Sequence, residues 1–349
     1  MKTTLSPLAK HPRTGSSYQP ARSSLKIGFT LVELLVAVTI TAIISGLMLG
    51  MVSYVMRSYN RTSGTLAAIS QSSAVLNQLS TDLQSAVFRN TGDVMMIVEL
   101  RNATDLPNWS TSKKPTGVLV EEDDSIATNR FGKGGARIKF FTAAPGFGFD
   151  QIESVRAVAY QILYRGITDA TEAPKEYQLY RSMVGSQETF NEGYNLTSGG
   201  YQGTSPATNN STQTLNTPPF NYVIASGTVD FGIRLLYDVN KDGELNVIFP
   251  RERDSAASIK QANGEVIPRS SRLTYHGIGN RSIVEVIGDQ VVGPLPEAVE
   301  VFVRVLTPAG IRELSAFEDG FIADGDWWTL VTQNSEVFSQ IIPIPSRPL

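Results

Sequence analysis

A single carboxylate, Glu33, lies inside the longest apolar run of the sequence. Between Phe29 and Met56 it is the only Asp, Glu, Lys or Arg. At about 1.5 Å per residue, a helix over this run is roughly 42 Å long, more than the roughly 30 Å of a bilayer core. A lone acid in lipid is costly and is usually retained for a function. The run therefore predicts a membrane helix over 29–56 with a functional carboxylate, Glu33, near its N-terminal end.

A second group of oxygen-bearing residues has the spacing of a calcium loop. From Asp238 onward, positions one, three, five and nine carry oxygen side chains, and position six is Gly243. This matches the first part of an EF-hand-type loop, although position twelve is Phe249 and not Glu. A polar hairpin turn explains the same residues, so calcium binding and a metal-free turn both stay open. The candidate ligands are Asp238, Asn240, Asp242, Glu244 and Asn246.

Other reaction chemistries find little support in the sequence. The chain has no cysteine and two histidines, His11 and His276, and His11 precedes the apolar run. A histidine metal site or a Ser-His-Asp triad would therefore depend on His276 alone. The glycine-rich stretches 131–135 and 145–149 lack the ending of a phosphate-binding loop, so we expect turns there. We expect no catalytic residue and no required cofactor.

The segment before the apolar run is basic. Residues 1–28 contain five Lys or Arg and no acid, and positive charge before an apolar span keeps that side cytoplasmic. The whole chain has 30 basic and 33 acidic residues. Without the five basic residues of 1–28, 25 remain against 33, a net charge of −8. An acidic surface of this kind argues against nucleic acid as a direct partner.

The apolar helix is expected to continue over 57–90 as an amphipathic helix. Apolar residues recur there at spacings of three, four or seven, which places them on one helical face. Gly64 is a candidate for a bend in this helix. The residues of the apolar face are Leu66, Ile69, Leu76, Leu79, Leu83 and Val87.

After Arg89 the apolar residues alternate, which indicates strands. Residues 191–219 are mostly Asn, Gly, Ser, Thr, Gln and Pro, so we expect a mobile loop that buries little apolar surface. A short helix is expected over Asp326–Gln340, and an extended segment after it. The expected strands are 94–100, 117–121, 136–142, 154–165, 176–184, 222–237, 247–249, 272–276, 282–287, 298–306 and 311–317. The predicted fold is α+β: one long N-terminal helix packed on antiparallel sheets within a β-rich globular domain over 91–349.

The string Gly28-Phe-Thr-Leu-Val-Glu33 closely resembles the processing site of type IV prepilins and type II secretion pseudopilins. In that family a membrane aspartyl peptidase cuts after the Gly and methylates the new N-terminal residue. The resemblance implies cleavage between Gly28 and Phe29, removal of 1–28 as a leader, and an N-methylated Phe29. Glu33 would then pair with the Phe29 amine, within one subunit or between neighbours in a filament.

Three later stretches resemble the J-type minor pseudopilins. They are the strand pair within 155–181, the stretch Val229–Asp238, and Pro294–Leu306 with its Leu-Pro-Glu-Ala-Val-Glu-Val sequence. This family commonly has a Trp before that late strand, whereas Trp327 and Trp328 follow it here.

The resemblance implies a minor subunit at or near the tip of a type II secretion pseudopilus, where it helps to start assembly. The implied partners are a prepilin peptidase and methylase, other minor and major pseudopilins, the inner-membrane assembly platform and the lipid bilayer. The implied location is the inner membrane, with a cytoplasmic N-terminus and a periplasmic globular domain, and then the filament. A minor pilin of a type IV pilus, used in adhesion or DNA uptake, and a pilin-anchored adhesin remain alternatives.

Overall fold

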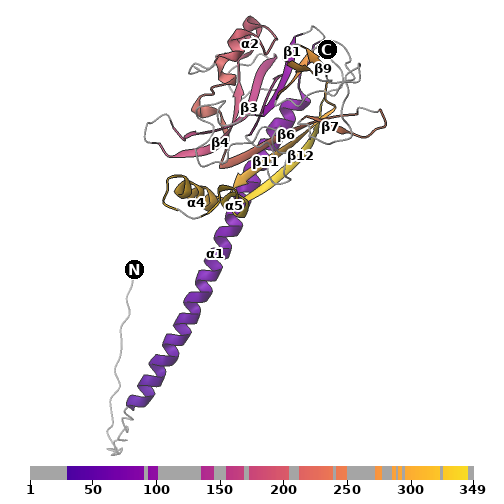
Figure 1. Ribbon diagram of the computed structural model, residues 1–349. Coiled ribbons are helices and arrows are strands. Elements are labelled where there is room, and N and C mark those ends of the chain that lie inside the picture. Colours follow the sequence, from indigo (N-terminus) through magenta and orange to yellow (C-terminus); the bar gives the residue numbers. More distant parts are fainter. Residues whose placement is uncertain are drawn as a thin grey trace, which may run out of the picture. The chain divides into compact units, whose positions relative to one another are not determined.

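The computed structural model shows one long helix and a globular unit with two sheets (Figure 1). The chain divides into two units, between Ser58 and Tyr59. The structure describes residues 30–89, 93–100, 135–144, 155–168, 173–203, 212–238, 241–249, 272–276, 285–287, 290–292, 295–322 and 325–344.

Helix α1 covers Leu31–Gln84. Its buried residues start at Gly64 and follow at spacings of mostly three or four. Small residues start the buried face, at Gly64, Ala68 and Ser72, and larger ones continue it from Val75. Leu66 and Ile69, predicted on this face, are 60% and 40% exposed. The prediction was wrong for these two because the inward stripe begins on the small residues beside them, which allow closer packing.

The predicted helix over 57–90 ends early, at Gln84. Beyond it the backbone begins to pair with strand β2 (Ala136–Thr142). Ala86 forms a bridge with Thr142, and the Val87 N–H donates to the Phe141 carbonyl at 2.9 Å. The backbone N–H groups thus change partner from the helix to the sheet, which ends the helix.

Two sheets form the globular unit. The first has the order β5-β4-β3-β2-β1-β8-β10-β9 and the second β12-β11-β6-β7. All neighbours pair antiparallel except β8 and β10, which are parallel. The strands are β1 Val94–Leu100, β2 Ala136–Thr142, β3 Arg156–Gly166, β4 Lys175–Met183, β5 Val223–Ser226, β6 Thr228–Tyr237, β7 Asn246–Phe249, β8 Arg272–His276, β9 Glu285–Ile287, β10 Gln290–Val292, β11 Ala298–Leu306 and β12 Ser335–Pro343.

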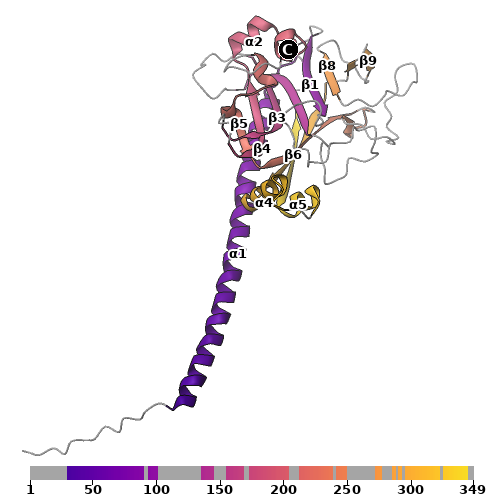
Figure 2. The ribbon, with the colours of Figure 1, turned by 60° about the vertical axis from the view of Figure 1, so that its left-hand side comes forward.

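One hydrophobic core joins α1 to both sheets. It includes Leu79 of α1, Phe140 and Tyr160 of the first sheet, and Phe231 and Val301 of the second. Figures 1 and 2 both show the helices α4 (Pro308–Glu318) and α5 (Trp327–Gln333) at the end of the globular unit where α1 enters it. Helix α2 (Ser186–Glu192) lies at the opposite end. The α+β fold predicted from the sequence is confirmed.

The predicted strand over 222–237 is in fact two strands in two sheets. Strand β5 closes one edge of the first sheet, and β6 lies inside the second. Gly227 separates them with a φ of +67°, which a residue with a Cβ seldom adopts. A Cβ there would also lie 2.6 Å from the Ile311 Cδ1 atom. The apolar residues continue on both sides of Gly227, so the sequence predicted one strand, but the chain passes from the first sheet to the second at this glycine.

The C-terminal predictions need two corrections. Residues 311–317, predicted as a strand, lie in α4, where Ile311, Leu314 and Phe317 recur every third residue. The Thr307 hydroxyl caps this helix by accepting from the Gly310 N–H at 3.1 Å. The helix predicted over 326–340 ends at Gln333, and residues 335–343 form strand β12, which pairs with β11 along its whole length.

The segment 191–219 also differs from the prediction of a loop with little burial. Its described part contains the end of α2, helix α3 (Gly199–Gln202) and the 3-10 turn η1 (Thr212–Leu215). Leu196, Tyr201 and Leu215 have no exposed surface. The second 3-10 turn, η2 (Phe220–Tyr222), leads into β5. Although most residues here are polar, these three apolar side chains pack in the hydrophobic core and hold the described part of the segment against it. The strand predicted over 117–121 lies outside the described residues.

Candidate functional site: the start of the long helix and its joint with the sheet

The first turn of α1 is closed by Thr30 and Glu33. The Glu33 Oε2 atom accepts hydrogen bonds from the Thr30 N–H and from the Thr30 hydroxyl, both at 2.9 Å. In return, the Thr30 Oγ1 atom accepts from the Glu33 N–H at 3.2 Å. This reciprocal arrangement is a capping box, and it satisfies two N–H groups that have no partner inside the helix. Glu33 is therefore held at the helix start by its own chain.

The predicted cleavage residues, Gly28 and Phe29, lie outside the described residues. Their peptide bond adjoins Thr30 in the sequence. A free amine at Phe29 would thus be one residue away from the group that Glu33 contacts. The pairing of Glu33 with that amine stays a prediction.

The N-terminal part of α1 is long and apolar enough to cross a membrane. Its most apolar 18-residue window has a mean hydropathy of 2.3, and none of that window is buried. This is the one helix in the described part of the chain that meets the length and composition criteria. Length and composition support membrane anchoring by this helix.

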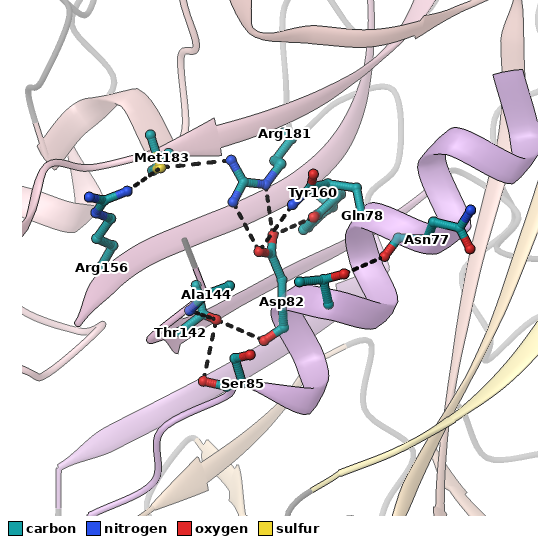
Figure 3. Close-up of polar contacts among 11 residues, drawn as sticks. Asn77, Gln78, Asp82, Ser85, Thr142, Ala144, Arg156, Tyr160, Arg181 and Met183 are labelled. Atoms are coloured by element: carbon teal, nitrogen blue, oxygen red, sulfur yellow. Dashed lines mark hydrogen bonds and ion pairs between the residues drawn. The ribbon is translucent and has the colours of Figure 1, made fainter. Parts of the chain in front are cut away.

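Near its other end, α1 is joined to the first sheet by a buried ion pair (Figure 3). Asp82, which has no exposed surface, accepts from Arg181 Nε at 2.7 Å and from Arg181 Nη2 at 2.9 Å. The Tyr160 hydroxyl donates to the same carboxylate at 2.5 Å, and Gln78 Nε2 donates at 3.3 Å. Strands β3 and β4 supply Tyr160 and Arg181. One helix carboxylate thus binds two adjacent strands.

The backbone beside Asp82 is fastened as well. The Thr142 hydroxyl of β2 donates to the Asp82 carbonyl at 2.8 Å. A further contact holds the helix a few turns earlier, where a Cβ on Gly64 would lie 3.3 Å from the Thr307 Cβ atom. Gly64 is thus a point of close approach to the start of α4, and its role in bending the helix stays a prediction.

Burial and charge keep the joint in one protonation state near neutral pH. Burial, followed by the charge of Asp82, raises the pKa of Tyr160 well above its usual range. Burial alone lowers the pKa of Arg181, but hydrogen bonds to Asp82 and the neighbouring charges raise it overall above the ordinary arginine value. Tyr160 thus remains a neutral donor and Arg181 a cation, so both act as donors to Asp82.

The sequence analysis did not identify Asp82, Tyr160 or Arg181. A signal was present, because Asp82 is the first acidic residue after Glu33 and follows Val75 and Leu79 at spacings of seven and three. These spacings place it on the apolar face of the helix, where an acid needs a buried partner. The identity of that partner depends on the pairing of β3 with β4 and could not be read from the helix.

The described residues of the predicted calcium segment before β7, 238 and 241–245, are joined by local hydrogen bonds. The two carboxylate oxygens of Asp238 accept from the Asp242 N–H at 3.1 Å and from the Gly243 N–H at 2.9 Å. Asp242 in turn accepts from the Glu244 N–H at 2.9 Å. Lys241 and Gly243 have positive φ values of 59° and 87°. The hydrogen bond from Gly243 is the largest cause of a pKa of Asp238 below its ordinary value.

These contacts direct the carboxylates of Asp238 and Asp242 to nearby backbone N–H groups. Asn240 lies outside the described residues, and Asn246 is the first residue of β7. Within the described ranges, no three acidic or histidine side chains are gathered as a metal site would need. The geometry accounts for the turn without a cation, and calcium binding stays a hypothesis.

Comparison with known families gives one match, at the N-terminus. The prokaryotic N-terminal methylation motif matches residues 24–49, which include Gly28, Phe29 and Glu33. This chain has a prepilin-like N-terminus. No curated protein and no solved structure gave a significant match. The motif supports a structural subunit of the type IV pilin and pseudopilin type, and it implies processing by a prepilin peptidase and assembly with other pilins.

Proposed function

We propose that the protein is a J-type minor pseudopilin, a subunit at or near the tip of a type II secretion pseudopilus. The observation that carries its coarser part, a pilin-type subunit, is the methylation motif at 24–49, placed at the start of a helix long enough to enter a bilayer. In this proposal the leader 1–28 is removed on the cytoplasmic side, and the globular unit lies in the periplasm. The role is structural and not catalytic.

The three J-type stretches support the finer assignment. The strand pair within 155–181 corresponds to β3 and β4, which pair over nine residues. The stretches 229–238 and 294–306 correspond to β6 and β11, which pair in the second sheet. The resemblance therefore involves strands that contribute to the core of both sheets, which is where sequence is most constrained by packing.

The size of the globular unit supports a place at the tip. The residues after Ser58 form one unit with its own core, and the chain outside the apolar helix is large for a filament lattice. Repeated subunits must fit a constant axial spacing, whereas a terminal subunit has no neighbour above it. A bulky unit is thus accommodated at the end of a filament.

The processing step is tested by mass spectrometry of protein extracted from membranes. The expected mature N-terminus is Phe29 with one methyl group on its amine. Glu33→Ala is expected to be cleaved normally and to enter filaments poorly, because the incoming amine then lacks its carboxylate partner. A chain recovered with residues 1–28 attached would contradict the whole assignment, and normal incorporation of Glu33→Ala would contradict the pairing mechanism.

The pseudopilus is distinguished from a type IV pilus by its companions. Cross-linking in cells through cysteines introduced into the globular unit should capture other minor pseudopilins, and deletion of the gene should abolish secretion without loss of surface pili. Loss of surface pili with normal secretion would instead identify a minor pilin, which shares the same N-terminal motif. Neighbouring genes for an assembly ATPase and further short prepilins would favour either filament over a lone adhesin.

A further inference from the structure

Met183 lies between two buried guanidinium groups at the end of β4. Its Sδ atom is 3.8 Å from Arg156 Nη1 and 3.7 Å from Arg181 Nη1 (Figure 3). Arg156 is 4% exposed and Arg181 is 6% exposed, whereas Met183 is partly exposed. The two cations belong to adjacent strands, β3 and β4. The thioether is therefore the acceptor for two charged donors that are largely removed from water.

A thioether is a poor acceptor for such donors. Its sulfur accepts hydrogen bonds only weakly, whereas hydrogen bonds from guanidinium to oxygen are among the stronger ones in proteins. The Nε and Nη2 atoms of Arg181 already bind Asp82, and Nη1 is the atom directed at the sulfur. An oxygen bonded to this sulfur would lie closer to both Nη1 atoms and would accept from them more strongly.

We propose that Met183 is a site of reversible oxidation to methionine sulfoxide by a peroxide, and that Arg156 and Arg181 hold the sulfoxide oxygen. In this step the sulfur lone pair attacks one peroxide oxygen, an S–O bond forms and the O–O bond breaks. The sulfur loses two electrons, and the other peroxide oxygen leaves as water after taking the proton. A methionine sulfoxide reductase acts in the opposite direction with electrons from thiols.

The other methionines provide internal comparisons. The chain has seven, and among them Met95 and Met96 of β1 are 0% and 1% exposed. Met48, Met51 and Met56 lie in the apolar helix, which detergent or lipid would cover. Among the described methionines of the globular unit, Met183 is thus the one that is not fully buried.

Oxidation here should strengthen the joint and not open it. A methionine sulfoxide normally disrupts packing because it places a polar group in an apolar site. At Met183 the polar group instead meets two guanidinium donors, and one of them is the residue that holds Asp82 of α1. The expected effect is therefore a higher stability of the connection between the helix and the sheet.

The test uses the full chain in detergent, treated with graded hydrogen peroxide and analysed by peptide mass spectrometry and thermal unfolding. Met183 should be oxidised before Met95 and Met96, and the melting temperature should stay constant or rise. Met183→Leu, treated in the same way, shows how much the oxidation of the other methionines changes the melting temperature, and this change is subtracted from that of the wild-type chain.

A second pair of variants needs no oxidant. Met183→Gln places a carbonyl oxygen near the two arginines, whereas Met183→Leu keeps an apolar side chain of similar size. Met183→Gln should melt at a temperature equal to or above that of Met183→Leu. The proposal is overturned if Met183 reacts no faster than Met95. It is equally overturned if oxidation lowers the melting temperature relative to treated Met183→Leu, or if Met183→Gln melts below Met183→Leu.

Discussion

Replacement of Asp82 by Asn tests whether the buried ion pair fastens α1 to the sheet. The variant keeps the size of the side chain and removes its charge, so the guanidinium of Arg181 stays buried beside a neutral group. Asp82 has no exposed surface and Arg181 is 6% exposed, so water cannot replace the lost partner. Breaking a buried pair by removing one partner costs about 3–5 kcal/mol. At about 2.1 cal/mol/K of unfolding entropy per residue, a unit that spans Tyr59–Leu349 should then melt about 5–8 °C lower.

The assay is thermal unfolding of the full chain in detergent, followed by circular dichroism. The matched control is Glu300→Gln, which breaks the partly exposed pair between Arg234 Nη1 and Glu300 Oε2 at 3.3 Å. Solvent screens this pair, so its loss should cost less than about 1 kcal/mol. A triple variant, Asp82→Leu with Arg181→Met and Tyr160→Phe, removes both charges and the hydroxyl that donates to Asp82, and it should be more stable than Asp82→Asn.

The reasoning would be refuted by either of two results. One is a melting temperature of Asp82→Asn that matches the Glu300→Gln control. The other is a triple variant that is destabilised by at least as much as Asp82→Asn, because the triple variant leaves neither a buried guanidinium nor a buried hydroxyl without a partner.

Three further predictions concern packing, pH and calcium. Gly64→Leu should destabilise the globular unit by about 1–3 kcal/mol through overpacking against Thr307, whereas Gly50→Leu, with nothing within 4 Å of its Cβ position, should not. Burial raises the pKa of Tyr160, so its contribution to stability is complete below the unfolded pKa of about 10 and is lost as pH rises above it. Urea unfolding from pH 8 to 12 should show this loss, and Tyr160→Phe should show a smaller one; equal slopes would contradict it. The calcium hypothesis predicts that Ca²⁺ raises the melting temperature of the wild-type chain but not of Asp242→Ala, and identical melts in Ca²⁺ and chelator discard it.

The pattern of apolar residues predicted an element correctly where it was compatible with only one type of secondary structure. The strands 94–100, 136–142 and 298–306 were predicted with the bounds that the structure has, because short segments rich in apolar residues end there at turn residues. The strand predicted at 311–317 failed because a spacing of three also brings apolar residues to one side of a helix. Thr307 and Pro308, a capping residue followed by proline at the first helical position, were the local signals for the helix.

The candidate site was predictable only where its geometry is local. Thr30 and Glu33 are three residues apart, so the Thr-x-x-Glu spacing already contains the capping box. The joint at Asp82 instead unites residues 78 and 99 positions apart in the chain. Gly227 likewise directs one apolar run into two sheets. Such contacts follow from strand pairing, which single-sequence periodicity does not determine.

The contact between Glu33 and Thr30 bears on how a subunit behaves before it joins others. Since Glu33 already accepts hydrogen bonds within its own first turn, its carboxylate is not left without donors in a lone subunit. A lone subunit in a membrane would therefore gain little free energy by associating with others through this carboxylate. If the predicted pairing with Glu33 forms, the newly freed amine of Phe29 must displace a hydroxyl and an amide N–H, and removal of the leader would then be required before the filament grows.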